Sequence, residues 1–197
     1  MKRNQFKPTI IKVLRSKWLC LVLLSISLTL SLIAIGFLGK SIANRTLSSF
    51  GREHRAWFIL WGVFTSLSVL SNMLMFQRDF NLHKRLLGII TVFGSMSVII
   101  TSLVVGEDTL QKVIHYTSVI TFGLLCFLGI AYSYFITRKQ KKSLNIILIV
   151  MTASAVADIV YFSICGLTAL CELLLLFVCQ FCIFFSNFII KSPNHKH

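Results

Sequence analysis

Six long apolar runs divide the sequence and decide what the chain can fold into. Each is close to the roughly 20 residues that an α-helix needs to cross the hydrocarbon of a bilayer. The runs are unbroken, whereas the strands of a membrane β-barrel alternate polar and apolar residues. We therefore predict an all-α integral membrane protein with six transmembrane helices, at residues 19–38, 56–76, 86–105, 113–136, 144–165 and 173–190.

The segments between these runs are short, and the longest covers residues 39–55. Because short connections leave consecutive helices side by side, we expect an antiparallel bundle. The bundle occupies residues 19–190, between a basic cytoplasmic segment at 1–18 and a cytoplasmic tail at 191–197. The spanning length of the first run favours a retained helix over a cleaved signal peptide.

The basic residues are distributed unevenly over the two sides of the predicted bundle. With a cytoplasmic amino terminus, fifteen of the 20 Lys and Arg residues lie on the cytoplasmic side and five on the other. Short loops rich in Lys and Arg remain in the cytoplasm. We therefore predict that both termini are cytoplasmic and that the protein resides in the plasma or cytoplasmic membrane.

The formal net charge of +14 invites comparison with nucleic-acid-binding proteins. Here, however, the basic residues lie between apolar runs and do not form one polar face with interleaved aromatic residues. We therefore expect membrane lipid as a partner and no nucleic acid. The sequence leaves open a homo-oligomer or a second membrane protein as a partner.

One acidic residue, Asp158, lies well inside a predicted span. An ionisable group in hydrocarbon is costly unless it meets a partner or water. Helical spacing places Ser154 and Tyr161 on the same stripe, which we expect to face the bundle. Ala153 and Ala157 form a pair of small residues that would allow close approach of another helix. A hydrogen-bonded packing seam and a ligand, proton or metal role both remain open.

Most other acidic residues, and two His residues, gather at the predicted outer ends of the helices. Together with Asp158 they could line a vestibule that binds a metal, relays protons or holds a polar head group. The sequence contains no paired metal-binding motif, and we predict no cofactor. His115 and Asp158 are nevertheless candidate ligands of a divalent metal. The candidate residues of the vestibule are His54, Glu107, Asp108, His115, Asp158 and Glu172.

The first outer connection combines bases with aromatic residues. Arg45, Arg52 and Arg55 lie near Phe50 and Trp57, a mixture that suits the lipid head-group level. These three Arg residues are therefore candidates for contact with lipid phosphate, with simple anchoring as the alternative.

Several amides and thiols lie within the apolar runs. We expect Asn72, Gln180 and Asn187 to hydrogen-bond between helices. Cys179 and Cys182 have CxxC spacing but lack the basic surroundings that stabilise a thiolate, so we expect them to pack in the core.

Two further cysteines, Cys165 and Cys171, bracket a short predicted turn. Their spacing allows a disulfide and does not require one. The sequence leaves their bonding open.

Residues 88–134 combine a Gly- and Ser-rich third helix, an acidic turn, and a fourth helix that contains Phe and Gly and opens with Lys112 to His115. This pattern resembles the DRAM and Frag group of six-helix membrane proteins and its bacterial relatives. The resemblance implies six helices, no established catalytic reaction and, for some members, roles connected with membrane or anchored lipids. Asp108 and His115 are the positions that match.

These observations favour one function and leave two others open. The leading hypothesis is a non-enzymatic membrane protein that accommodates a lipid or small amphiphile, with outer His and acidic groups at its polar end. The first alternative is a membrane-embedded hydrolase whose metal, held by His115 and Asp158, activates water. The second is a small proton-coupled transporter centred on Asp158.

Overall fold

The structure, a computed structural model of the chain, describes residues 14, 16–82, 85–106, 108–139, 142–166 and 168–190. Within these ranges it is helical and contains no strand. The long helices are α2 (Lys17–Leu38), α4 (Arg55–Asp79), α5 (Arg85–Leu103), α6 (Thr109–Thr137), α7 (Lys142–Cys165) and α8 (Ala169–Phe184). The short elements are the 3-10 helix η1 (Gly39–Ala43), the helix α3 (Leu47–Glu53) and the π-helical turn η2 (Phe185–Ile189).

Six helical segments in the described part of the chain are long and apolar enough to cross a membrane. Their bounds differ from the predicted spans by at most five residues. Large apolar side chains remain exposed on their surfaces, including Trp18, Phe93 and Leu110. Such a surface suits hydrocarbon rather than water. The predicted all-α architecture with six membrane-spanning candidates is confirmed.

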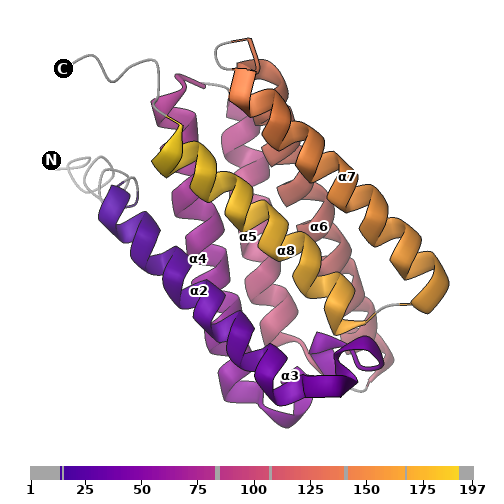
Figure 1. Cartoon of the computed structure of the whole chain (residues 1–197). Coiled ribbons are helices and arrows are strands. Elements are labelled where there is room, and N and C mark those ends of the chain that lie inside the picture. The colour runs from indigo at the N-terminus through magenta and orange to yellow at the C-terminus, as the bar shows by residue number, and fades with distance from the viewer. Residues whose placement is uncertain are drawn as a thin grey trace, which may run out of the picture.

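Consecutive long helices run in opposite directions, as Figure 1 shows. The start of α2 and the turn η2 lie at one end of the bundle, and α3 lies at the other. We call the end that carries α3 the outer end. Because the number of long helices is even, the described chain begins and finishes at the same end of the bundle.

Hydrogen bonds from polar side chains hold α8 against α2 and η2 against α4. Gln180 Nε2 donates to Ser27 Oγ over 2.7 Å, and the Ser27 hydroxyl pairs with Thr65 Oγ1 over 2.9 Å. Asn187 Nδ2 donates to the backbone oxygen of Asn72 over 2.9 Å. The predicted role of these amides in joining helices is confirmed.

Small residues allow α4, α5 and α6 to approach one another closely. A Cβ atom at Gly62 of α4 would overlap the Ser102 side chain of α5. A Cβ at Gly94 of α5 would lie 3.0 Å from Cys126 Sγ on α6. These glycines therefore allow neighbouring helices to approach closely, as is common between helices in membranes.

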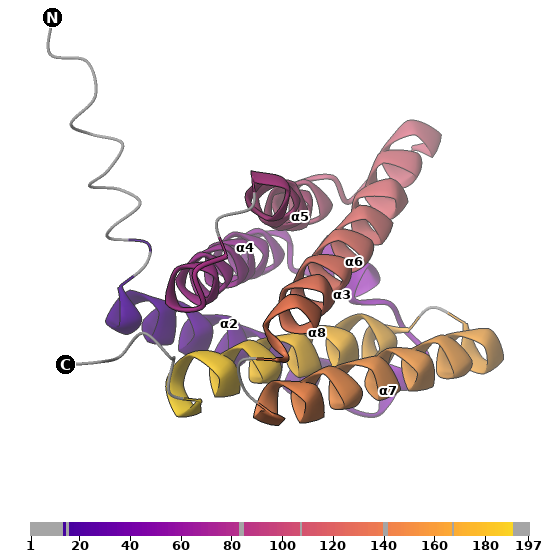
Figure 2. The same ribbon diagram turned by 90° about the horizontal axis from the view of Figure 1, so that it is seen from above.

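Helix α7 packs less closely than its neighbours and lies at the edge of the bundle (Figure 2). It packs against α6 and α8, and its buried residues are Leu144 and Met151, both in its first half. Ala153 and Ala157 are exposed. No helix among the described residues therefore packs on this alanine pair, and close approach of a helix there stays a prediction.

The cysteines of the spans behave as small apolar residues. Cys179 and Cys182 are each 6% exposed and belong to the main hydrophobic core, which confirms their predicted packing role. Cys165 is exposed and Cys171 is buried, and the two are not bonded to each other.

We expect Gly62→Ala to destabilise the protein, because the added methyl group must displace the Ser102 side chain. Overpacking of this kind costs about 1–3 kcal/mol. The measurement is the melting temperature of the purified protein in detergent. Gly36→Ala is the matched control, since a Cβ at this exposed position on α2 has no atom within 4 Å. Equal melting temperatures for the two variants would contradict the close contact between α4 and α5.

Candidate functional site

A cavity of about 230 Å³ opens in the bundle between α3, α4, α5, α6, α7 and α8. Most of its wall is apolar and includes Phe58 of α4 and Phe122, Phe127 and Ile130 of α6. On α6 its lining extends from His115 to Ile130. At 1.5 Å per residue this is a length of about 22 Å. The cavity is therefore long and runs along the helix axes.

The ionisable residues of the wall lie toward the outer end. Glu172 is in the first turn of α8, and Asp158 is two turns before the end of α7. His115 is in the second turn of α6. All three line the cavity, so the structure brings together three of the residues that the sequence suggested. The wall toward the other end is formed by residues such as Val69, Ile130 and Cys179.

His115 is 6% exposed, and its ring is fixed by the end of α5. Its Nδ1 atom lies 3.0 Å from the backbone oxygen of Thr101 and 2.9 Å from that of Val104. Backbone oxygens only accept hydrogen bonds, so Nδ1 carries a proton and donates it. In the neutral ring this leaves the lone pair on Nε2. His115 thus donates to backbone oxygens at the C-terminal end of α5. Its Nε2 atom remains able to accept a hydrogen bond.

Asp158 is half-buried and faces the bundle, as its stripe predicts. Its carboxyl group lies beside the thiol of Cys171. The Oδ1 atom is buried and has no hydrogen-bond partner among the described residues. Ser154 and Tyr161 are also half-buried on this stripe, but neither lines the cavity. A buried acceptor without a partner is costly, so the Oδ1 atom of Asp158 would be stabilised by a donor.

Glu172 joins α8 to the first outer connection. Its Oε2 atom accepts a hydrogen bond of 2.6 Å from the backbone N–H of Leu47, the first residue of α3. A second bond runs close by, from the N–H of Ala169 to the backbone oxygen of Arg45 over 2.6 Å. A carboxylate at this point satisfies one of the free N–H groups that begin every helix. These two bonds hold α3 over the outer end of the cavity.

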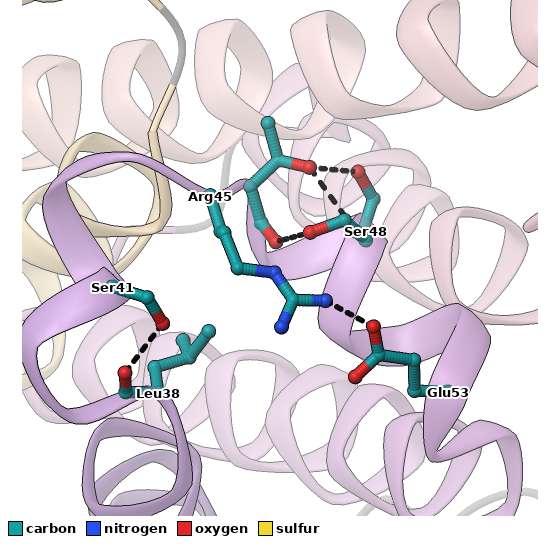
Figure 3. Close-up of polar contacts among 7 residues, drawn as sticks. Leu38, Ser41, Arg45, Ser48 and Glu53 are labelled. Atoms are coloured by element: carbon teal, nitrogen blue, oxygen red, sulfur yellow. Dashed lines mark hydrogen bonds and ion pairs between the residues drawn. The ribbon is translucent and has the colours of Figure 1, made fainter.

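Helix α3 was not expected from the sequence, because seven residues are too few for a periodic pattern. Its start could have been found from Thr46, whose Oγ1 accepts the N–H of Ser49 as an N-cap. Figure 3 shows the polar contacts around it, including the ion pair between Arg45 and Glu53. Leu47 and Ser48 of α3 form part of the cavity wall.

Other predicted site residues lie away from the cavity. His54 is exposed, with its ring 5.6 Å from that of Phe37. Asp108 is exposed at the start of α6. Neither lines the cavity, and Glu107 lies outside the described residues. The vestibule around His115 therefore takes in Glu172 but not His54 or Asp108.

The three candidate head-group residues occupy different places at the outer end. Arg45 pairs with Glu53, whereas Arg52 and Arg55 are exposed. Arg55 also borders a second hollow beside Gly106 and Gln111. Contact of these residues with lipid phosphate stays a prediction.

Within the described ranges, no group of three or more His, Cys, Asp or Glu side chains is arranged to hold a metal ion. His115 and Asp158 both line the cavity, but their role as a metal pair stays a prediction.

Comparisons with family models, curated proteins and solved structures gave no match to this chain. The resemblance of residues 88–134 to the DRAM and Frag group stays a prediction.

We expect Glu172→Ala to loosen α3, because Leu47 loses the acceptor of its N–H. Loss of such a bond costs about 1–3 kcal/mol. The measurement is amide hydrogen exchange over Leu47–Glu53, which should become faster. Glu172→Gln should keep the slow exchange, since its amide oxygen can still accept from Leu47. Exchange in Glu172→Ala as slow as in the wild type would show that Glu172 does not hold α3.

Proposed function

We propose that this protein is a non-enzymatic, multi-pass membrane protein that accommodates a lipid or small amphiphile in the cavity. The observation that carries the proposal is the division of the cavity wall. Its outer part includes His115, Asp158 and Glu172, whereas the part toward Ile130 and Cys179 is apolar. An amphiphile has the same division, with a polar head and an apolar chain.

The shape of the cavity supports this proposal. Ligand sites are mostly apolar with a few polar groups that set orientation. Here the apolar part follows α6 for several turns, so a chain can lie parallel to the helices. Its head would then lie near the outer ends of α6 and α8. A compact polar substrate would leave the Phe-lined part of the wall without a partner.

The position of α7 supports entry from the bilayer. Ile159 and Phe162 line the cavity, yet their side chains are 64% and 49% exposed. These residues therefore belong both to the cavity wall and to the apolar surface of the bundle. A lipid can pass from hydrocarbon into the cavity beside α7 without crossing water.

The orientation of the protein is part of the proposal. The excess of Lys and Arg favours cytoplasmic termini in the plasma or cytoplasmic membrane. The outer end of the bundle, with α3 and the polar part of the cavity, then faces away from the cytoplasm.

We expect Gly123→Leu to reduce the amount of bound lipid several-fold. Gly123 lines the cavity, and a Cβ there has no atom within 4 Å, so the leucine side chain can enter the free space. The measurement is the quantity of lipid that co-purifies, determined by mass spectrometry.

Gly36→Leu is the matched control, because it adds the same side chain at an exposed glycine of α2 outside the cavity. Its bound lipid should equal that of the wild type. Both variants should melt no lower than the wild type, since leucine favours helix more than glycine does. Unchanged lipid in Gly123→Leu would refute the cavity as the binding site.

The proposed orientation predicts opposite accessibility for Asp108 and Lys139, which lie next to opposite ends of α6. In a chain without other cysteines, Asp108→Cys should react with a membrane-impermeant maleimide added to intact cells. Lys139→Cys should react only after the membrane is permeabilised. Labelling of both residues from one side would refute the arrangement.

A further inference from the structure

The donor groups around the outer part of the cavity are already engaged with the protein. The Nδ1–H of His115 donates to backbone oxygens of α5 and the segment after it. Trp61 lines the cavity, but its Nε1–H donates to Ser31 Oγ on α2 over 2.9 Å. Thr101 Oγ1 donates to Ser118 Oγ over 3.0 Å. None of these donors is left for a ligand.

One further hydroxyl and one thiol of the outer wall have partners within the protein, and the thiol, that of Cys171, lies beside the Asp158 carboxyl group as well. The Ser48 hydroxyl pairs with Thr46 Oγ1 over 2.9 Å. The Cys171 thiol points to the backbone oxygen of Gly166 over 3.8 Å. A ligand head that needs donors from the protein would therefore have to displace internal hydrogen bonds.

Acceptor atoms, in contrast, remain available. Asp158 Oδ1 is buried without a hydrogen bond among the described residues. Glu172 uses Oε2 for Leu47, and that bond leaves Oε1. The neutral His115 ring has its lone pair on Nε2. Three side chains of the wall thus offer acceptors, and two of them are carboxyl groups.

The described lining contains no Lys or Arg that could balance these carboxyl groups. Arg52 and Arg55 of the outer end are exposed and do not line the cavity. Although the chain has a net charge of +14, the polar part of the cavity is acidic. Carboxylates in an apolar wall are stabilised by a cation that also donates hydrogen bonds.

We propose that the cavity selects an amphiphile with a protonated amine as its head group, and this inference rests on the function proposed above. An ammonium group has three donors and no acceptor, so it can donate to a carboxyl group of the wall such as that of Asp158. The chain lies along α6 toward Ile130. A head group that is a carboxylate or phosphate is disfavoured by like charge, and a neutral alcohol satisfies fewer of the acceptors.

The test compares brominated dodecylamine, dodecanol and dodecanoate, which share one chain and differ in the head group. Trp18 and Trp57 are replaced by Phe, so that bromine on the chain reports binding by quenching the fluorescence of Trp61, which lines the cavity. Titrations are made with the full-length protein in neutral detergent at pH 7, where an alkylamine is protonated like the Lys side chain. We expect the amine to bind about tenfold more tightly than the alcohol, and the carboxylate to bind more weakly still.

Asp158→Asn and Glu172→Gln each replace a carboxyl group by an amide of the same shape. Each should remove most of the advantage of the amine over the alcohol. Asp108→Asn is the matched control, because it removes an exposed carboxyl group at the outer end that does not line the cavity. It should keep the preference for the amine.

The outcomes separate this inference from the proposed function. Equal binding of amine and alcohol, tighter binding of the carboxylate, or a preference for the amine that survives both cavity variants would overturn the selection of an amine. Absence of quenching by all three compounds would overturn the proposed function and this inference with it.

Discussion

Hydrogen bonds that polar side chains of α8 and η2 make to α2 and α4 set the arrangement on which the rest of the structure depends. Gln180, Ser27 and Thr65 form one such group, and Asn187 with Asn72 forms another. Each bond of this kind contributes about 0.6–2 kcal/mol in a membrane protein. Its geometry is more restrictive than that of apolar contact, because an unpaired amide in hydrocarbon is costly. These bonds fix which side of α8 faces α2 and α4.

Helix α7 takes no part in these hydrogen bonds and packs at the edge of the bundle (Figure 2). It contacts α6 and α8 and buries Leu144 and Met151 in its first half, while its second half remains open. The space that remains between α6, α7 and α8 becomes part of the cavity. The less closely packed helix α7 thus forms one side of the cavity, through Asp158, Ile159 and Phe162.

Residues of the candidate site also support the fold. His115 binds backbone oxygens at the end of α5, and Glu172 binds the N–H of Leu47 at the start of α3. Each side chain then has a second polar atom that is not used in that contact. Removing such a side chain would therefore affect both the fold and the candidate site. A substitution that preserves shape, such as an amide for a carboxyl group, separates the two roles.

The sequence by itself determined the six apolar helices, the role of Asn72, Gln180 and Asn187 between helices, and the inward direction of Asp158. These features follow from local length, hydropathy and the cost of a polar group in hydrocarbon. The tertiary structure decided that Glu172 would join His115 and Asp158, that His54 and Asp108 would not, and that α3 would cover the cavity. The physical reason is that these outcomes depend on the rotation of each helix about its axis and on contacts between distant residues, such as Leu47 and Glu172, which are 125 positions apart.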